Sequence, residues 1–221
     1  MNQYLILIII VSIGSSIVQG MVRSNFVKYS KVANARGVSG AEIAQAISDH
    51  FGLGVLVGRS KGGALSDHYD PRTKQINLSK EVFDGRSVAA AAIAAHEMGH
   101  AQQHQQGYAA LAFRNSLLPV VSISSQLWIW ALLAGMFFSS TGLYTLGIVL
   151  FAGVVVFQLV TLPVEFNASK RAQQFLTEYG IISSDQVPGA QAVLKSAGYT
   201  YIVAALASLG QLAMLMGNRR R

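Results

Sequence analysis

The chain has 221 residues, of which 52% are hydrophobic and only 12% are charged. A soluble globular domain carries about 25% charged residues, so this composition argues against one and indicates a membrane protein. The net charge is +7, but no aromatic–basic repeats accompany it, and we predict no nucleic-acid partner. The absence of cysteine excludes disulfides and thiolate zinc sites.

The first apolar run, residues 4–22, is uncharged and long enough to cross a bilayer. A cleaved signal peptide would carry a basic segment before this run and a small-residue cleavage site after it. Both are missing, so we expect the run to be retained as a transmembrane helix. Basic residues without an intervening acid follow it: Arg23, Lys28, Lys31 and Arg36. Such a cluster is typical of a cytosolic juxtamembrane segment and can attract anionic lipid head groups.

Residues 23–114 are the only stretch long enough for a compact extramembrane domain. Ser39 and Glu42 fit a capping box at the start of a short amphipathic helix, which Gly52 would end. A second, longer helix is predicted from Ser87 to about residue 107.

Short strand-like pieces lie between these two helices, at residues 54–57, 65–69 and 75–78. Turn-forming Gly-Gly and Asp-Pro pairs separate them and predict a small sheet. The last piece, extended to residues 74–79, has two interpretations. An edge strand there could bind an extended peptide through main-chain hydrogen bonds, whereas a core strand would only support the sheet.

Residues 115–164 contain no charged side chain, and this run is longer than one span requires. A helix crosses the hydrocarbon core in about 20 residues. The polar cluster 139–142 lies near the middle of the run. We therefore predict two spans, 117–138 and 143–163, joined by a tight turn. The uncharged run 199–217 predicts a fourth span.

The predicted long helix contains the sequence HEMGH, from His96 to His100. Residues four apart share one helix face, so both imidazoles can bind one zinc ion. Glu97 would act as the general base, taking a proton from water and passing it to the leaving amine. The alternative is a polar face with two solvated histidines, but the alanine-rich helix and the preceding strands favour a zinc site. Gly99 is explained if the helix packs closely against another element.

A catalytic zinc site needs a third protein ligand. The metzincin pattern would place a histidine at position 106, which is Gln106 here. His104 lies about 6 Å beyond His100 along a straight helix, so we expect it beside the site. Glu165 is the better candidate, because a carboxylate at a membrane exit is costly unless it faces a polar partner. It could instead pair with Lys170 or another base at the interface.

Segments 94–105 (AAHEMGHAQQHQ), 162–172 (LPVEFNASKRA) and 65–79 (LSDHYDPRTKQINLS) together resemble the YugP-like membrane zinc metallopeptidases of bacteria, which are similar to the wider HtpX-type peptidases. The resemblance covers most of the chain. It implies a gluzincin-like zinc peptidase with His96, His100 and Glu165 as ligands and Glu97 as the catalytic base.

The wider group usually has an acid four residues after this glutamate, and Ser169 stands there in this chain. A carboxylate that orients a ligand histidine would then come from elsewhere, and Asp67 and Asp70 are the candidates. With them, Ser169 and His104 are the residues expected around the ligands.

The developing oxyanion needs a hydrogen-bond donor besides zinc. The candidates are Arg171, His68 and Tyr108, although each could instead make an ordinary surface contact. Arg171 follows Glu165 by six residues, which rotates it off the face of that side chain.

The topology supports a shared site, because two predicted spans between HEMGH and Glu165 return the chain to the same side. The basic cluster at 23–36 assigns that side to the cytosol, in a multi-pass protein of the bacterial cytoplasmic membrane. The basic tail 219–221 would then lie outside, against the positive-inside rule. We give more weight to the earlier cluster, which adjoins the first span.

We therefore predict a mainly α, α+β fold: an integral membrane, zincin-like metallopeptidase with about four transmembrane helices and a small sheet-plus-helix catalytic domain. The predicted segments are 1–22 (first transmembrane helix), 23–114 (catalytic part), 115–164 (transmembrane hairpin), 165–198 (helical segment with the third ligand) and 199–221 (fourth transmembrane helix and basic tail).

The predicted function is a membrane-anchored zinc endopeptidase that cleaves membrane or juxtamembrane proteins. One alternative is an intramembrane protease, which the polar residues 102–106 beside the motif disfavour. The other is a non-enzymatic membrane scaffold with a structural zinc site, which would normally have four protein ligands.

Overall fold

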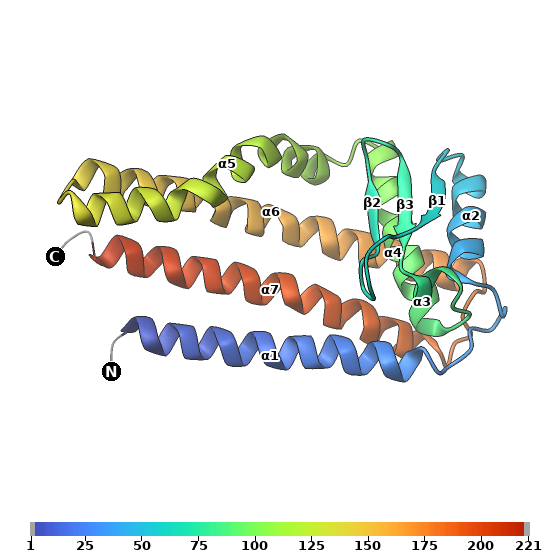
Figure 1. The fold of residues 1–221 in the computed structure, drawn as a ribbon. Helices are drawn as coiled ribbons and strands as arrows, with labels where there is room; N and C mark the ends of the chain where they lie inside the picture. Colours follow the sequence, from blue (N-terminus) through green and yellow to red (C-terminus); the bar gives the residue numbers. More distant parts are fainter. Residues whose placement is uncertain (1–2, 219–221) are drawn as a thin grey trace. The chain divides into compact units, whose positions relative to one another are not determined.

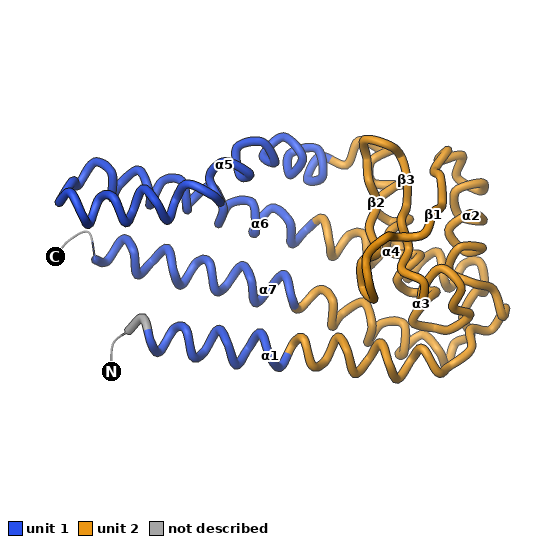
Figure 2. The backbone as a smooth tube through the Cα atoms, in the orientation of Figure 1, with its two compact units in different colours: residues 1–17, 109–163, 200–221 blue, residues 18–108, 164–199 orange. Residues whose placement is uncertain are grey.

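The computed structural model describes residues 3–218 and is mainly helical with one small sheet, as predicted (Figure 1). The chain forms two compact units, drawn in blue and orange in Figure 2. Unit 1 comprises residues 1–17, 109–163 and 200–221, and unit 2 comprises residues 18–108 and 164–199. The basic tail, residues 219–221, is not among the described residues, so the structure does not bear on its predicted location.

Within the described residues, unit 2 contains a three-stranded sheet of β1 (Leu56–Arg59), β2 (His68–Asp70) and β3 (Gln75–Leu78). Its order is β1-β3-β2, with β3 parallel to β1 and antiparallel to β2. Ile76 and Leu78 of β3 are fully buried and alternate with more exposed neighbours, as a half-buried strand requires. The edge-strand interpretation of residues 74–79 is therefore wrong, because β3 is the central strand.

Helix α2 (Gly40–Phe51) begins and ends as its sequence predicts. The Ser39 N–H donates to Glu42 Oε2 at 2.6 Å and the Glu42 N–H donates to Ser39 Oγ at 3.2 Å, which completes the capping box. Gly52 adopts the left-handed conformation that ends the helix, with φ of 60°. A short helix, α3 (Lys80–Phe83), follows the sheet.

Helix α4 (Val88–Gln105) runs through the core of unit 2. Ser87 caps it, because its Oγ accepts the Ala90 N–H at 3.2 Å. The alanines of its first half are at most 1% exposed, and their small side chains allow elements to pack closely around the helix. At Gly99 an added Cβ would lie 2.6 Å from the Ala168 carbonyl oxygen, so the backbones of α4 and α6 (Thr141–Glu178) touch. The expected close packing at Gly99 is confirmed.

In unit 1, α5 (Ala109–Phe137) and α6 form the predicted hairpin, joined by a turn at residues 138–140. A Cβ at Gly135 would lie 2.5 Å from the Tyr144 nitrogen, so this glycine lets the two helices approach beside the turn. Helix α5 changes direction along its length in Figure 1, and Pro119 lies inside it. Proline bends helices by removing a hydrogen bond and crowding the preceding turn.

In the described part of the chain four helices are long and apolar enough to cross a membrane. These are α1 (Gln3–Tyr29), α5, α6 and α7 (Val187–Asn218). Their number agrees with the prediction, but each helix is longer than its predicted span: α1 and α6 end later, and α5 and α7 begin earlier. Hydropathy marks where lipid contact ends, whereas a helix continues until its backbone hydrogen bonding is interrupted. Consequently α6 runs through Pro163 and reaches Glu165 without a break.

Candidate metal site

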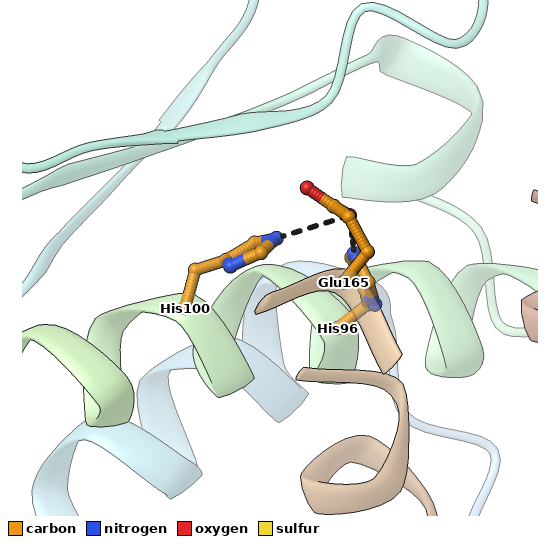
Figure 3. A group of neighbouring side chains, drawn as sticks. All are labelled: His96, His100 and Glu165. Carbon is orange, nitrogen blue, oxygen red and sulfur yellow. Dashed lines mark ion pairs between the residues drawn. The ribbon is translucent and has the colours of Figure 1, made fainter. Parts of the chain in front are cut away.

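Three side chains of unit 2 converge at one point between α4 and α6 (Figure 3). His96 Nε2 lies 3.3 Å from Glu165 Oε2, and His100 Nε2 lies 3.6 Å from the same oxygen. The three candidate ligand atoms lie within 4.8 Å of one another. The structure thus brings together the two histidines of the motif and the glutamate 65 residues further along the chain.

Both imidazoles leave Nε2 available for a metal, because each Nδ1 has a partner on the opposite side of the ring. His96 Nδ1 lies 3.2 Å from Ser169 Oγ, and His100 Nδ1 lies 3.1 Å from Gln103 Oε1. A neutral imidazole that donates from Nδ1 carries its lone pair on Nε2. Two such nitrogens and one carboxylate fit zinc, which takes three protein ligands of these types in catalytic sites.

The electrostatics of the cluster reflect its burial. The side chain of Glu165 is 5% exposed and that of His100 is 12% exposed. Burial by itself lowers the pKa of His100, but hydrogen bonding to Glu165 and the charges of Glu165 and Glu97 outweigh it, so the net pKa is raised. The acidic surroundings therefore favour a cation at this position.

Glu97 follows His96 on α4 and is itself buried. Its charge acts to raise the pKa of both His100 and Asp67. Glu97 is not one of the three converging ligand candidates. As the residue after His96 in the sequence, it remains the candidate for the general base.

A hydrogen-bond network that the sequence analysis missed extends behind His100. Gln103 is fully buried, and its Nε2 donates to the Val164 carbonyl and to Asn167 Oδ1, both at 2.9 Å. One signal could have identified it: Gln103 is four residues after Gly99 and therefore lies on the close-packed face of α4. A polar side chain on such a face needs hydrogen-bond partners inside the protein.

The three oxyanion candidates have different surroundings. Arg171 donates from Nε to Asn167 Oδ1 at 2.7 Å, and its Nη1 donates to Gln102 Oε1 and, at 2.7 Å, to Gln106 Oε1. The last two bonds connect α6 to the C-terminal end of α4 and its cap residue. His68 lies on β2, exposed, where Nδ1 donates to the Ser66 carbonyl and Nε2 accepts from Asn77 Nδ2. Tyr108 is half-buried beyond the end of α4.

The residues expected around the ligands also divide into separate groups. Ser169 contacts His96, as described above. Asp67 instead accepts hydrogen bonds from the Ser79 N–H at 2.7 Å and the Ser79 hydroxyl at 3.1 Å. Asp70 accepts the Arg72 N–H at 2.9 Å. His104 Nδ1 lies 2.9 Å from the Tyr69 hydroxyl, one helical turn beyond His100.

The chain is similar to known proteins over most of its length. The model of a family described as "Putative neutral zinc metallopeptidase" matches residues 4–219. A curated relative, "Putative membrane protease YugP" from Bacillus subtilis (strain 168), is 46% identical over 194 residues. The alignment covers 88% of this chain and 86% of the relative. No solved structure matches the chain.

Proposed function

Because this chain belongs to the family of neutral zinc metallopeptidases, we propose that it is a membrane-anchored endopeptidase that hydrolyses peptide bonds of membrane or juxtamembrane proteins. The observation that carries the proposal is the convergence of His96, His100 and Glu165 on one point, with Glu97 next to His96 in the sequence of α4. This arrangement corresponds to a gluzincin-like site, with two imidazoles and one carboxylate as the zinc ligands.

In the proposed mechanism the metal supplies Lewis-acid chemistry, since bound zinc lowers the pKa of water and polarises a carbonyl. The protein supplies the remaining functions. Glu97 takes a proton from the attacking water and delivers it to the amine that leaves. Ser169 and Gln103 hold the two imidazoles in orientation through their Nδ1 atoms.

Two further features support the choice of substrate and location. Helix α4, which carries the HEMGH motif, is not one of the four apolar helices, and this favours chemistry outside the lipid. Glu165 lies on α6, only two residues after Pro163 at the end of the uncharged run. We infer that the site faces the cytosol close to the bilayer surface, where membrane-embedded substrates emerge.

The test compares full-length wild-type protein with Glu97→Gln and His100→Ala, purified in detergent. Zinc content is measured by elemental analysis, and hydrolysis is followed with fluorescently labelled casein and with reconstituted membrane proteins. We expect Glu97→Gln to retain zinc and lose about 10²- to 10⁴-fold of the hydrolysis rate, which is the usual contribution of general acid–base catalysis. His100→Ala should lose both zinc and activity.

Glu178 is exposed, and Glu178→Gln is a matched control that makes the same chemical change away from the site. Wild-type zinc content in His100→Ala would contradict the metal site. Full hydrolysis by Glu97→Gln would contradict the role of Glu97. If the zinc-loaded wild-type protein hydrolysed neither substrate, the interpretation as a non-enzymatic scaffold would replace the interpretation as an enzyme.

A further inference from the structure

We propose that a directional chain of side-chain hydrogen bonds, from Arg171 through Asn167 and Gln103, fixes the tautomer of His100 in the form that binds zinc. Gln103 is then a positioning residue that acts through His100. The inference rests on the proposed function, because it assigns His100 Nε2 as a metal ligand.

The direction of this series of hydrogen bonds is set at its Arg171 end. An arginine guanidinium can only donate, so the Arg171 Nε–H bond of 2.7 Å requires an oxygen at the Asn167 side. This contact orients the Asn167 amide with Oδ1 toward Arg171. The guanidinium is itself held by the side-chain oxygens of Gln102 on α4 and of Gln106, which caps that helix.

In the middle of the series, two contacts constrain the orientation of the Gln103 amide. Gln103 faces both Asn167 Oδ1 and the backbone carbonyl of Val164 at 2.9 Å. Both partners accept and neither donates, so the NH₂ group of Gln103 must point toward them. The Gln103 side chain is fully buried, and reversing its amide would leave two acceptors facing an oxygen.

The tautomer of His100, at the other end of the series, follows from this orientation. With its NH₂ group engaged, Gln103 presents Oε1 to His100 Nδ1 at 3.1 Å. An amide oxygen accepts only, so Nδ1 must carry a hydrogen. In the neutral ring, which is the form that binds a metal, the lone pair is then on Nε2, the atom that lies 3.6 Å from Glu165 Oε2. Because Val164 directly precedes Glu165, the same amide also ties His100 to the α6 backbone that carries the third candidate ligand.

His96 lacks this constraint. Its Nδ1 partner is the Ser169 hydroxyl at 3.2 Å, and a hydroxyl can either donate or accept. The two histidines of the motif therefore differ: Gln103 imposes the tautomer of His100, whereas Ser169 accommodates either tautomer of His96.

The test substitutes Gln103→Met, which approximates the shape of glutamine but removes its amide. Gln105→Met is the matched control, since Gln105 is an exposed glutamine of the same helix that contacts the carbonyls of Phe51 and Gly52. Zinc affinity of the full-length protein is measured by competition with a chelator. The visible absorption of the cobalt-substituted protein reports ligand geometry, and the thermal unfolding midpoint of the metal-free protein reports folding.

We expect Gln103→Met to bind zinc about 10- to 100-fold more weakly, as is usual when a partner of a ligand histidine is lost. Its cobalt spectrum should change, while Gln105→Met should match the wild type in both measurements. Asn167→Leu, which breaks the chain without touching His100, should give a smaller loss of affinity in the same direction. It is the variant to use if Gln103→Met does not fold.

The outcomes separate the two proposals. If the wild type binds no stoichiometric zinc, the proposed function fails. If the wild type binds zinc and either folded variant keeps wild-type affinity and the wild-type cobalt spectrum, the positioning inference is overturned while the function stands.

Discussion

Asp67 is a partly buried carboxylate whose environment opposes its ionisation. Burial raises its pKa above the ordinary value of 3.8, and the charge of Glu97 acts in the same direction. The hydrogen bonds donated by the backbone and hydroxyl of Ser79 lower the pKa but only partly compensate. The folded protein therefore holds a proton on Asp67 that the unfolded chain releases at lower pH.

This proton predicts how stability varies with pH. Between pH 3.8 and the raised folded pKa the folded state binds more protons, so the contribution of Asp67 to stability falls as pH rises through that window. Asp67→Asn should abolish this decline, because an amide does not bind a proton in this pH range. Its oxygen can still accept the Ser79 N–H, so the hydrogen bond is kept. Across this pH window, the thermal unfolding midpoint of Asp67→Asn should rise relative to that of the wild type as pH increases.

If the difference between the midpoints of the wild type and Asp67→Asn did not change over this pH range, the raised pKa of Asp67 would be contradicted. Asp67→Ala provides a contrast at the same position. It leaves the N–H and hydroxyl of the fully buried Ser79 without the acceptor they have in the wild type, and should lower the midpoint throughout.

Ser169 offers a second test at the residue scale. Its hydroxyl contacts His96 Nδ1 at the position where the wider HtpX-type group carries an acid. Ser169→Asp should tighten zinc binding, because a charged acceptor makes a hydrogen bond roughly twice as strong as a neutral one and increases the basicity of the imidazole. Ser169→Ala should weaken it. The ranking Asp, Ser, Ala in chelator competition is the expected result, and a reversed order would contradict the orienting role.

At the scale of elements, the contact between α4 and α6 depends on Gly99. Gly99→Ala places a Cβ 2.6 Å from the Ala168 carbonyl oxygen, so the helices must separate. Overpacking of this kind costs about 1–3 kcal/mol. The separation also moves His96 and His100 away from Glu165, so zinc affinity should fall together with the thermal midpoint.

Gly20→Ala is the matched control for this change. Gly20 lies inside α1, where an added Cβ would meet no atom within 4 Å beyond the adjoining residues and backbone of its own helix, and alanine favours helix by about 0.5–1 kcal/mol. Its zinc affinity should equal that of the wild type. Equal behaviour of the two glycine variants would argue against a close-packed helix contact at Gly99.

The elements also indicate what a sequence can reveal. The capping box at Ser39 and the long helix after Ser87 were predictable, because their signals lie within a few residues of one another. The central position of β3 was not, since strand order depends on pairing between distant segments. The role of Gln103 was hidden for the same reason: its partners Val164 and Asn167 lie 61 and 64 residues away.

For the whole molecule the decisive prediction concerns orientation. The basic residues after the first span and the paired spans of the hairpin lead us to expect residue 60 in the cytosol and residue 221 outside. Green fluorescent protein and alkaline phosphatase fusions at these two positions measure this directly, because the first is fluorescent inside and the second is active outside. Phosphatase activity at residue 60 would overturn the assignment.

The separation of the candidate ligands along the chain has a consequence for biosynthesis. His100 is translated 65 residues before Glu165. At about 5–20 residues per second, the ribosome needs roughly 3–13 seconds to cover that distance. During this interval the nascent chain already contains the HEMGH sequence but lacks its third proposed ligand. Under the proposed function, a product terminated during this interval would lack one of the three zinc ligands, so hydrolysis would have to await synthesis of the second hairpin helix.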